Sequence, residues 1–297
     1  HLSYYERELP MSEKERSTLN ELGGRLLPPD LWTSIAGMQN EKQLLERRLV
    51  LPLQDPETAE TYGVEAPRAI VLFGPPGTGK TTFAKAVASR LNWPFVEVFP
   101  ARLSGDSRGL AGALRETFTK ISELDNVVVF IDEVEEIASH RKGEPPAPTQ
   151  GVTNELLKLI PMFREGRGRL LIVATNFIRA LDAAFLRHGR FDYVIPIGLP
   201  DEDARRSIWT RYIPPQSLES VDLDRLVERT DGFSPADIEY AARKGSQRAL
   251  EEAVYQDGGR KGQSTDDYDW AIGQTRMTVS KDVAEDFLVD IDELARL

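Results

Sequence analysis

The segment GPPGTGKT at residues 74–81 contains the residue types best suited to do chemistry. It fits the pattern G-x-x-x-x-G-K-[ST], in which the backbone N–H groups of a glycine-rich loop surround phosphate groups. Gly77 and Gly79 allow this curvature, and a helix that follows would point its positive N-terminal end at the phosphates. Lys80 is expected to reach the β- and γ-phosphates, and the Thr81 hydroxyl to bind magnesium.

The sequence on either side of this loop supports phosphate binding. The apolar run AIVLF at 69–73 predicts a strand that leads into the loop, and TTFAKAVASRL at 81–91 predicts a helix that leaves it. A glycine- and proline-containing turn without a function is the alternative interpretation. Because the pattern seldom occurs by chance between such a strand and such a helix, we prefer a nucleotide site.

Two carboxylates follow a second apolar run, in VVVFIDE at 127–133. In a chain with a phosphate-binding loop, Asp132 is expected to hold the magnesium shell. Glu133 is suited to orient or deprotonate the attacking water molecule. A strand that simply ends at solvent is the alternative, and Glu135 and Glu136 are interpreted as a solvated continuation. Coming after the phosphate-binding loop, the carboxylate pair favours a catalytic role.

Alternating strands and helices must position these two motifs. Strands are predicted at 69–73, 95–99, 127–131, 170–174 and 193–197. Helices are predicted at 39–51, 81–91, 111–124 and 152–163. Short apolar runs separated by helices indicate a parallel sheet that is covered on both faces. After Pro200 only helices are predicted, at 201–213, 222–229, 235–255 and 280–295.

These patterns divide the 297 residues into three parts. We expect an N-terminal arm or linker at 1–29, an α/β nucleotide-binding domain at 30–199 and a small helical domain at 200–297. Residues 140–150 and 256–276 are rich in proline, glycine or polar residues and are predicted to be mobile. Because the first residue is His1 rather than Met, we expect that flanking domains of a longer protein are missing.

Composition limits the classes of function. Hydrophobic residues make up 40% and charged residues 29%, as in ordinary globular proteins, and no apolar run is long enough for a transmembrane segment. The absence of cysteine excludes disulfides and thiolate metal sites and fits the reducing cytosol, so a cytoplasmic location is expected. The net charge of −11 argues against a general nucleic-acid-binding protein.

Two further motifs, ATN at 174–176 and LRHGRFD at 186–192, complete a resemblance to AAA+ ATPases. The chain is similar to the AAA group in the narrow sense, which includes membrane-bound and proteasomal unfoldases and ring segregases, over residues 30–295. The resemblance implies an α/β fold of the P-loop NTPase type, a parallel sheet with helices on both faces, followed by a small helical lid domain. It also implies ATP and Mg²⁺ as cofactors, a hexameric homo-oligomeric ring, and a protein substrate or adaptor as partner.

The resemblance implies roles for further residues. Asn176 would be a sensor that contacts the γ-phosphate and the attacking water. Arg187 and Arg190 would be arginine fingers that stabilise the transferring phosphoryl group in a neighbouring subunit's site; a solvated basic turn is the alternative. The residues expected to contact the nucleotide are Ile35, Ala36 and Gly37 at the adenine, Pro76, Gly77, Thr78, Gly79, Lys80, Thr81 and Thr82 around the phosphates, and Gly232 and Ala236 at the base and ribose.

The chain departs from the family pattern at two places. Threading members carry an aromatic residue in a pore loop after the second strand, whereas SGDSRGLAG places Asp106, Ser107 and Arg108 near that position. Leu110 or Arg108 would then have to grip a substrate. The segment IPMFREGRGRL also replaces an MDG-like turn that signals between subunits, so coupling between neighbours is expected to be built differently.

Three functions remain open from the sequence. We favour a ring-forming ATPase whose ATP hydrolysis remodels, unfolds or disassembles a protein substrate. The missing pore aromatic leaves open an ATP-switched assembly or binding module with slow turnover, although Glu133, Asn176 and Arg187 argue for competent hydrolysis. A nucleic-acid-associated loader is less favoured because of the acidic net charge, and no nucleic acid is expected as a partner.

Overall fold

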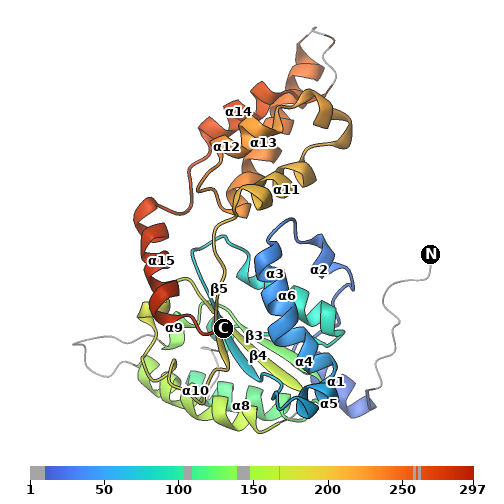
Figure 1. Cartoon of the computed structure of the whole chain (residues 1–297). Coiled ribbons are helices and arrows are strands. Elements are labelled where there is room, and N and C mark those ends of the chain that lie inside the picture. Colours follow the sequence, from blue (N-terminus) through green and yellow to red (C-terminus); the bar gives the residue numbers. More distant parts are fainter. Residues whose placement is uncertain (1–10, 104–108, 139–147, 167, 257–258, 260–261) are drawn as a thin grey trace.

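The computed structural model describes residues 11–103, 109–138, 148–166, 168–256, 259 and 262–297. Its centre is one parallel sheet with the strand order β2-β3-β4-β1-β5 (Figure 1). The strands are β1 (Ala69–Phe73), β2 (Phe95–Val98), β3 (Val127–Ile131), β4 (Arg169–Thr175) and β5 (Tyr193–Pro196). All five lie where apolar runs predicted them.

Successive residues of each central strand enter different hydrophobic cores. In β1, Val71 and Phe73 pack into one core cluster, whereas Ile70 and Leu72 pack into another on the opposite face. Side chains alternate across a strand, so a sheet buried on both faces requires an unbroken apolar run. This is why AIVLF and VVVFI form strands although neither shows an apolar–polar alternation.

Helices cover both faces of the sheet. One face packs against α3 (Gln39–Leu45), a π-helical turn at Glu46–Val50 and α6 (Lys80–Leu91). The other face packs against α8 (Gly109–Ile121) and α10 (Pro148–Arg164). Short helices complete this part: α2 (Leu31–Ser34), α4 (Leu51–Gln54), α5 (Pro56–Thr61), α7 (Pro100–Leu103) and α9 (Glu135–Ala138). The helix predicted at 39–51 is thus α3, the π-helical turn and the start of α4.

Part of the predicted N-terminal arm packs on the sheet domain. Helix α1 (Glu13–Glu21) begins with a capping box, in which the Ser12 hydroxyl accepts a hydrogen bond from the Glu15 N–H. Leu19 is buried in the same core cluster as α8 and α10. Farther along, the backbone of Arg25 pairs antiparallel with Phe95, at the edge of β2.

The helices after Pro200 enclose a third hydrophobic core. Helices α11 (Glu202–Tyr212), α12 (Leu223–Arg229), α13 (Pro235–Tyr255) and α14 (Thr265–Gln274) surround Trp209 and Tyr268, whose rings meet edge-on with centroids 5.5 Å apart. Helix α14 lies within the stretch predicted to be mobile, so that prediction is wrong over this helix. Its polar first turn begins at a Ser264–Asp267 capping box, and Tyr268, Ala271 and Ile272 are buried behind it.

The last helix, α15 (Lys281–Leu294), returns to the sheet domain (Figure 1). Phe287 packs edge-on against Phe73 of β1, with ring centroids 5.7 Å apart. Just after the helix, the backbone of Arg296 pairs with Val194 of β5. The chain therefore crosses between the sheet domain and the C-terminal helices twice. In the described ranges, no helix combines the length and apolarity needed to cross a bilayer.

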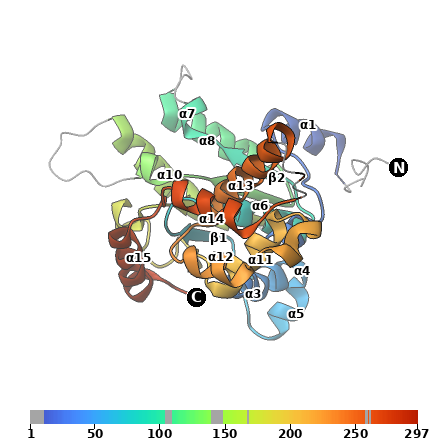
Figure 2. The same cartoon turned by 90° about the horizontal axis from the view of Figure 1, so that it is seen from above.

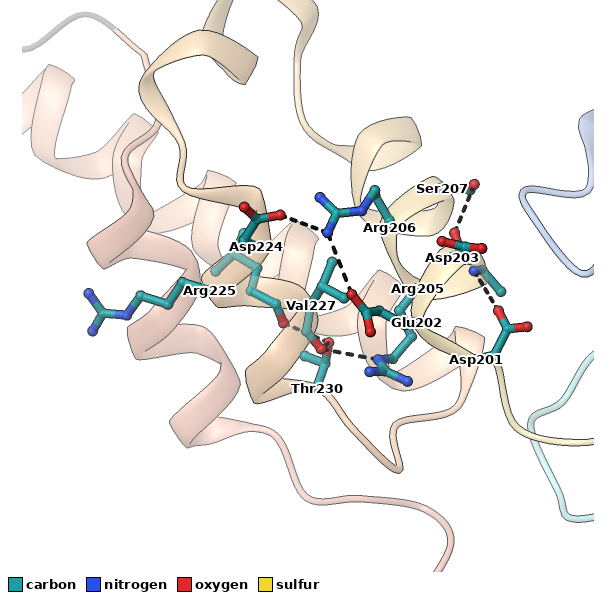
Figure 3. Close-up of polar contacts among 12 residues, drawn as sticks. Asp201, Glu202, Asp203, Arg205, Arg206, Ser207, Asp224, Arg225, Val227 and Thr230 are labelled. Atoms are coloured by element: carbon teal, nitrogen blue, oxygen red, sulfur yellow. Dashed lines mark hydrogen bonds and ion pairs between the residues drawn. The ribbon is translucent and has the colours of Figure 1, made fainter.

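Arg205 joins α11 to α12, which follows it in the chain (Figure 3), and also to Pro200, which precedes it. Its side chain is buried, with Nε donating to the Val227 carbonyl at 3.1 Å and Nη1 to the Pro200 carbonyl at 3.2 Å. The neighbouring Arg206 pairs at 2.7 Å with Asp224, which is exposed. Arg205 thus makes two buried hydrogen bonds, together with an ion pair at 3.5 Å to the exposed Asp231, whereas Arg206 pairs with exposed carboxylates.

We expect Arg205→Ala to lower the free energy of unfolding by about 2–4 kcal/mol, because two buried carbonyls lose a charged donor. Arg206→Ala is the matched control and should cost about 0–1 kcal/mol, as exposed ion pairs do. Urea unfolding followed by circular dichroism measures both. Equal losses for the two variants would contradict the role assigned to Arg205.

Candidate nucleotide site

The phosphate-binding loop connects β1 directly to α6. Gly77 and Gly79 have φ angles of 77° and 94°, in the left-handed region that favours glycine. A Cβ atom at Gly77 would also lie 3.2 Å from the Ser234 hydroxyl oxygen, at the start of α13. Within the loop, the Thr78 hydroxyl donates to the Pro75 carbonyl at 2.9 Å. The loop therefore has the tight curvature that its sequence predicts.

Lys80 is buried at the first position of α6. Its ammonium group donates to the carbonyls of Gly74 and Pro75, at 2.8 Å each. Burial lowers the pKa of Lys80 to about 8, although the negative charges of Asp132 and Glu135 act in the opposite direction. The lysine charge thus lies inside the loop and close to the carboxylates that follow β3.

The two predicted metal ligands are neighbours. The Thr81 hydroxyl donates to Oδ2 of Asp132 at 3.1 Å, across the gap between α6 and the end of β3. Oδ1 of Asp132 accepts a hydrogen bond from the Glu133 N–H at 2.8 Å. Hydroxyl and carboxylate oxygens are hard donors, which suit Mg²⁺. The residues present therefore fit the predicted magnesium site.

Glu133 has an exposed side chain and an unusual backbone. Its φ angle is 48°, which is uncommon for a residue other than glycine and occurs often at functional sites. Loss of hydration raises the pKa of Glu133, and the nearby carboxylates of Glu136, Asp132 and Glu135 raise it further. A raised pKa brings a carboxylate closer to the range in which it exchanges protons near neutral pH.

Asn176 follows β4 and contacts the third carboxylate of this segment. Its N–H donates to Oε1 of Glu135 at 3.3 Å. The prediction that Glu135 is solvated is wrong, because its Oε2 is buried, whereas Glu136 is exposed as predicted. Helix α9 begins only at Glu135, so the spacing from Asp132 is not a helical one, and no local pattern marks Glu135 as part of the site.

A cavity of about 290 Å³ adjoins the phosphate-binding loop, between the sheet domain and the C-terminal helices. Figure 2 shows α11 and α13 above α6 and the sheet. Seven predicted nucleotide contacts line this cavity: Ile35, Ala36, Gly77, Thr78, Gly79, Thr82 and Ala236. Sequence reasoning missed the lining residues Ile208, Arg211, Tyr212 and Glu239, because no motif marks them on their helices.

Five predicted contacts lie outside this lining: Lys80 and Thr81, described above, and Gly37, Gly232 and Pro76. Gly37 faces α11, where an added Cβ would come within 2.7 Å of the Ala204 Cα atom. Gly232 has a φ angle of 82° and lies near Met277 rather than in the cavity. Pro76 is half-buried within the phosphate-binding loop. Gly37 and Gly232 thus shape the backbone around the cavity.

The predicted finger arginines occupy a turn between β4 and β5. Arg187 is exposed, whereas Arg190 is half-buried and donates to the Ala184 carbonyl. Asp192 anchors the turn by accepting hydrogen bonds from the N–H groups of Arg68 and Ala69, at 2.7 and 3.1 Å.

The guanidinium of Arg164 completes this anchor. It donates to both oxygens of Asp192, at 2.7 and 2.9 Å, and also to the Arg190 carbonyl at 3.2 Å. Burial alone would raise the pKa of Asp192, but the hydrogen bonds from Arg164 and the two amides hold it below its ordinary value. The segment that replaces the MDG-like turn therefore connects to the finger turn.

Comparison with known proteins decides the family. The AAA family, the ATPase family associated with various cellular activities, matches residues 70–199, and the AAA+ lid domain matches residues 220–260. A proteasome-activating nucleotidase of Methanococcus vannielii is 33% identical over 282 residues, which cover 94% of this chain and 67% of that protein. The chain belongs to the AAA+ ATPases. We call helices α11–α14 the lid from here on.

Other AAA+ relatives match shorter shares of their own length. A Cell division cycle protein 48 homolog of Archaeoglobus fulgidus is 36% identical over 231 residues, 76% of this chain and 31% of that protein. A proteasome-activating nucleotidase of Thermococcus kodakarensis is 36% identical over 248 residues, 82% of this chain and 62% of that protein. The chain thus spans between about a third and two thirds of these relatives.

A solved structure confirms the predicted AAA+ fold. The AAA domain of FIGL-1 in complex with ADP superposes with a TM-score of 0.77 at 22% sequence identity, covering 97% of this chain and 99% of that one. The parallel sheet with helices on both faces and the helical C-terminal part therefore form a known AAA architecture.

We expect Asp192→Asn to lower the free energy of unfolding at pH 7 by about 1.5–3 kcal/mol, through weakened hydrogen bonds to Arg164 and two amides. Because folding lowers the pKa of Asp192, its contribution is complete above the ordinary value and is lost as pH falls through the lowered one. The difference from wild type should therefore shrink below about pH 4. Urea unfolding at several pH values tests this, with the exposed Asp224→Asn as control; a pH-independent difference would contradict it.

Proposed function

We propose that this chain binds ATP with Mg²⁺, hydrolyses ATP and works as one subunit of a cytoplasmic hexameric ring that remodels, unfolds or disassembles a protein. One observation supports this most strongly. Lys80, the Thr81–Asp132 pair and the Asn176–Glu135 pair meet where β1, β3 and β4 end. These are the groups that phosphoryl transfer to water needs at one place.

The loop and the cavity would bind opposite ends of the nucleotide. The N–H groups at the start of α6 suit the phosphates, whose oxygens would replace the Gly74 and Pro75 carbonyls as acceptors for Lys80. Ile35, Ala36 and Ala236 offer apolar contacts for the base. Thr81 and Asp132 would hold Mg²⁺, which neutralises charge on the phosphates when bound.

Glu133 and Asn176 would act on the attacking water. Glu133 is exposed beside the magnesium ligands, and its raised pKa suits a group that takes up a proton during the reaction. Asn176 lies on the neighbouring strand end and would orient the same water and the γ-phosphate.

The finger turn supports assembly into a ring. Arg187 points to solvent from a turn that Asp192 and Arg164 hold in place, so it can act in a neighbouring subunit. Because two relatives are named proteasome-activating nucleotidases and a third a Cell division cycle protein 48 homolog, protein remodelling is the favoured coupling. We also propose that the lid moves about the connection near Pro200 when ATP is turned over.

Residues at the predicted pore-loop position would have to grip a protein substrate. Asp106, Ser107 and Arg108, at the predicted pore-loop position, lie outside the described residues. Leu110 is half-buried and packs against the core under α8 and α10, which leaves little of its side chain for a grip. The sequence SGDSRGLAG lacks an aromatic, which favours an ATP-switched assembly module as the second candidate. Slow turnover that a protein partner does not accelerate would distinguish that module.

We expect Glu133→Gln to bind ATP but to hydrolyse it about 10²–10⁴-fold more slowly, because the group that accepts the proton is lost. Lys80→Ala should lose ATP binding. Phosphate release and titration with a fluorescent ATP analogue measure the two effects, with the exposed Glu60→Gln as control. Hydrolysis by Glu133→Gln at the wild-type rate would refute the catalytic assignment.

We expect Arg187→Ala to bind ATP and to hydrolyse it at least about 10³-fold more slowly, because a finger arginine stabilises transition-state charge. Mixing Arg187→Ala with Glu133→Gln should restore part of the activity, since an intact site then receives Arg187 from its neighbour. The exposed Arg47→Ala is the control. Full hydrolysis by Arg187→Ala alone would show that the finger assignment is wrong.

A further inference from the structure

Two carboxylates of the 132–136 segment are partly buried, Asp132 and Glu135. Asp132 is a proposed magnesium ligand, whereas Glu135 has no assigned role. Its Oε1 accepts a hydrogen bond from the Asn176 N–H at 3.3 Å. Its Oε2 is buried and has no hydrogen-bond partner within the part of the chain that the structure describes. Most buried side-chain oxygens in proteins have a hydrogen-bond partner, so this unpaired oxygen calls for an explanation.

The contact belongs to a set of hydrogen bonds that joins three segments of the site. The Val134 N–H donates to the Ala174 carbonyl at 3.0 Å, one step before Glu135 contacts Asn176. On the other side, the Gly74 N–H donates to the Thr175 carbonyl at 3.3 Å. The end of β4 is thus linked both to the turn that carries Glu133 and to the start of the phosphate-binding loop.

Within this set, Glu135 makes the link that uses a side chain. The other two links join a backbone N–H to a backbone carbonyl and use no side chain. The Glu135 link depends on one carboxylate, and it holds the residue whose side chain is the proposed sensor. The same charge also acts on Lys80 and Glu133, since it raises the pKa of both groups.

We propose that Glu135 is a positioning residue that sets the orientation of Asn176 relative to Glu133 for hydrolysis. It holds the backbone of Asn176 so that the amide side chain and the Glu133 carboxylate face the same water. Its free oxygen remains available for a second donor when the site closes around nucleotide. The inference rests on the proposed function, because it assigns a role within the same hydrolytic site.

The test compares Glu135→Ala, Glu135→Gln, Asn176→Ala and the double variant Glu135→Ala/Asn176→Ala, in the full chain. Glu135→Ala should lower kcat by about 10²-fold, as loss of positioning does, with the Kd for a fluorescent ATP analogue and the Tm unchanged. Glu135→Gln keeps an oxygen that can accept from the Asn176 N–H, so it should recover most of the rate. The double variant should be no slower than Asn176→Ala, because there is no sensor amide left to orient.

Glu60→Ala is the matched control, since Glu60 is an exposed glutamate on α5, away from the site, and it should keep the wild-type kcat. Wild-type kcat in Glu135→Ala overturns the proposal, and so does an equal further loss in the Asn176→Ala background. A fall in Tm or in ATP affinity that accounts for the lost rate also overturns it. Glu133→Gln is measured in parallel: if wild type is no faster than this variant, the proposed function itself fails and the inference fails with it.

Discussion

The pairing of β3, β4 and β1 as neighbouring parallel strands is the constraint on which the site depends. Phe73 pairs with Thr175, and Ile131 pairs with Val173, so the three strands end at the same edge of the sheet. The phosphate-binding loop, Asp132 and Asn176 each begin where one of these strands ends. A slip of one residue in either pairing would turn every side chain of a strand to the other face. The two buried cores prevent such a slip, and so the apolar packing fixes the distance between Thr81 and Asp132.

The lid is held to this sheet at two crossings of the chain. At the first, Arg205 joins the Pro200 carbonyl to the Val227 carbonyl of α12. At the second, α15 leaves the lid and packs through Phe287 against Phe73, the residue just before the phosphate-binding loop. Ion pairs of Arg179 with Asp290 and Glu293 hold the outer side of α15. A displacement of the lid would therefore be transmitted to the sheet next to the loop.

The sequence predicted features that are local and missed those that depend on distant residues. The strands and the loop could be predicted because a strand buried on both faces is an apolar run and the loop is a contiguous pattern. The anchor between Arg164 and Asp192 could not, because 28 positions separate the two residues and each alone resembles a surface charge. Helix α14 could not be predicted because its polar first turn resembles a surface loop in the sequence. The spacing of apolar residues in α15 indicates an amphipathic helix. It does not indicate which hydrophobic core the apolar face packs against.

Under the proposed function, the charge balance of the site would connect hydrolysis to assembly. Residues 132–136 carry four carboxylates, and Lys80 is the one cation among the residues predicted to contact the nucleotide. ATP adds further negative charge at the same place, where partial burial weakens the screening by water. Under the proposed function, a divalent cation at Thr81 and Asp132 offsets part of this excess. Arg187 from a neighbouring subunit would supply the remainder, so a single subunit would bind nucleotide yet lack the positive charge that the transition state requires.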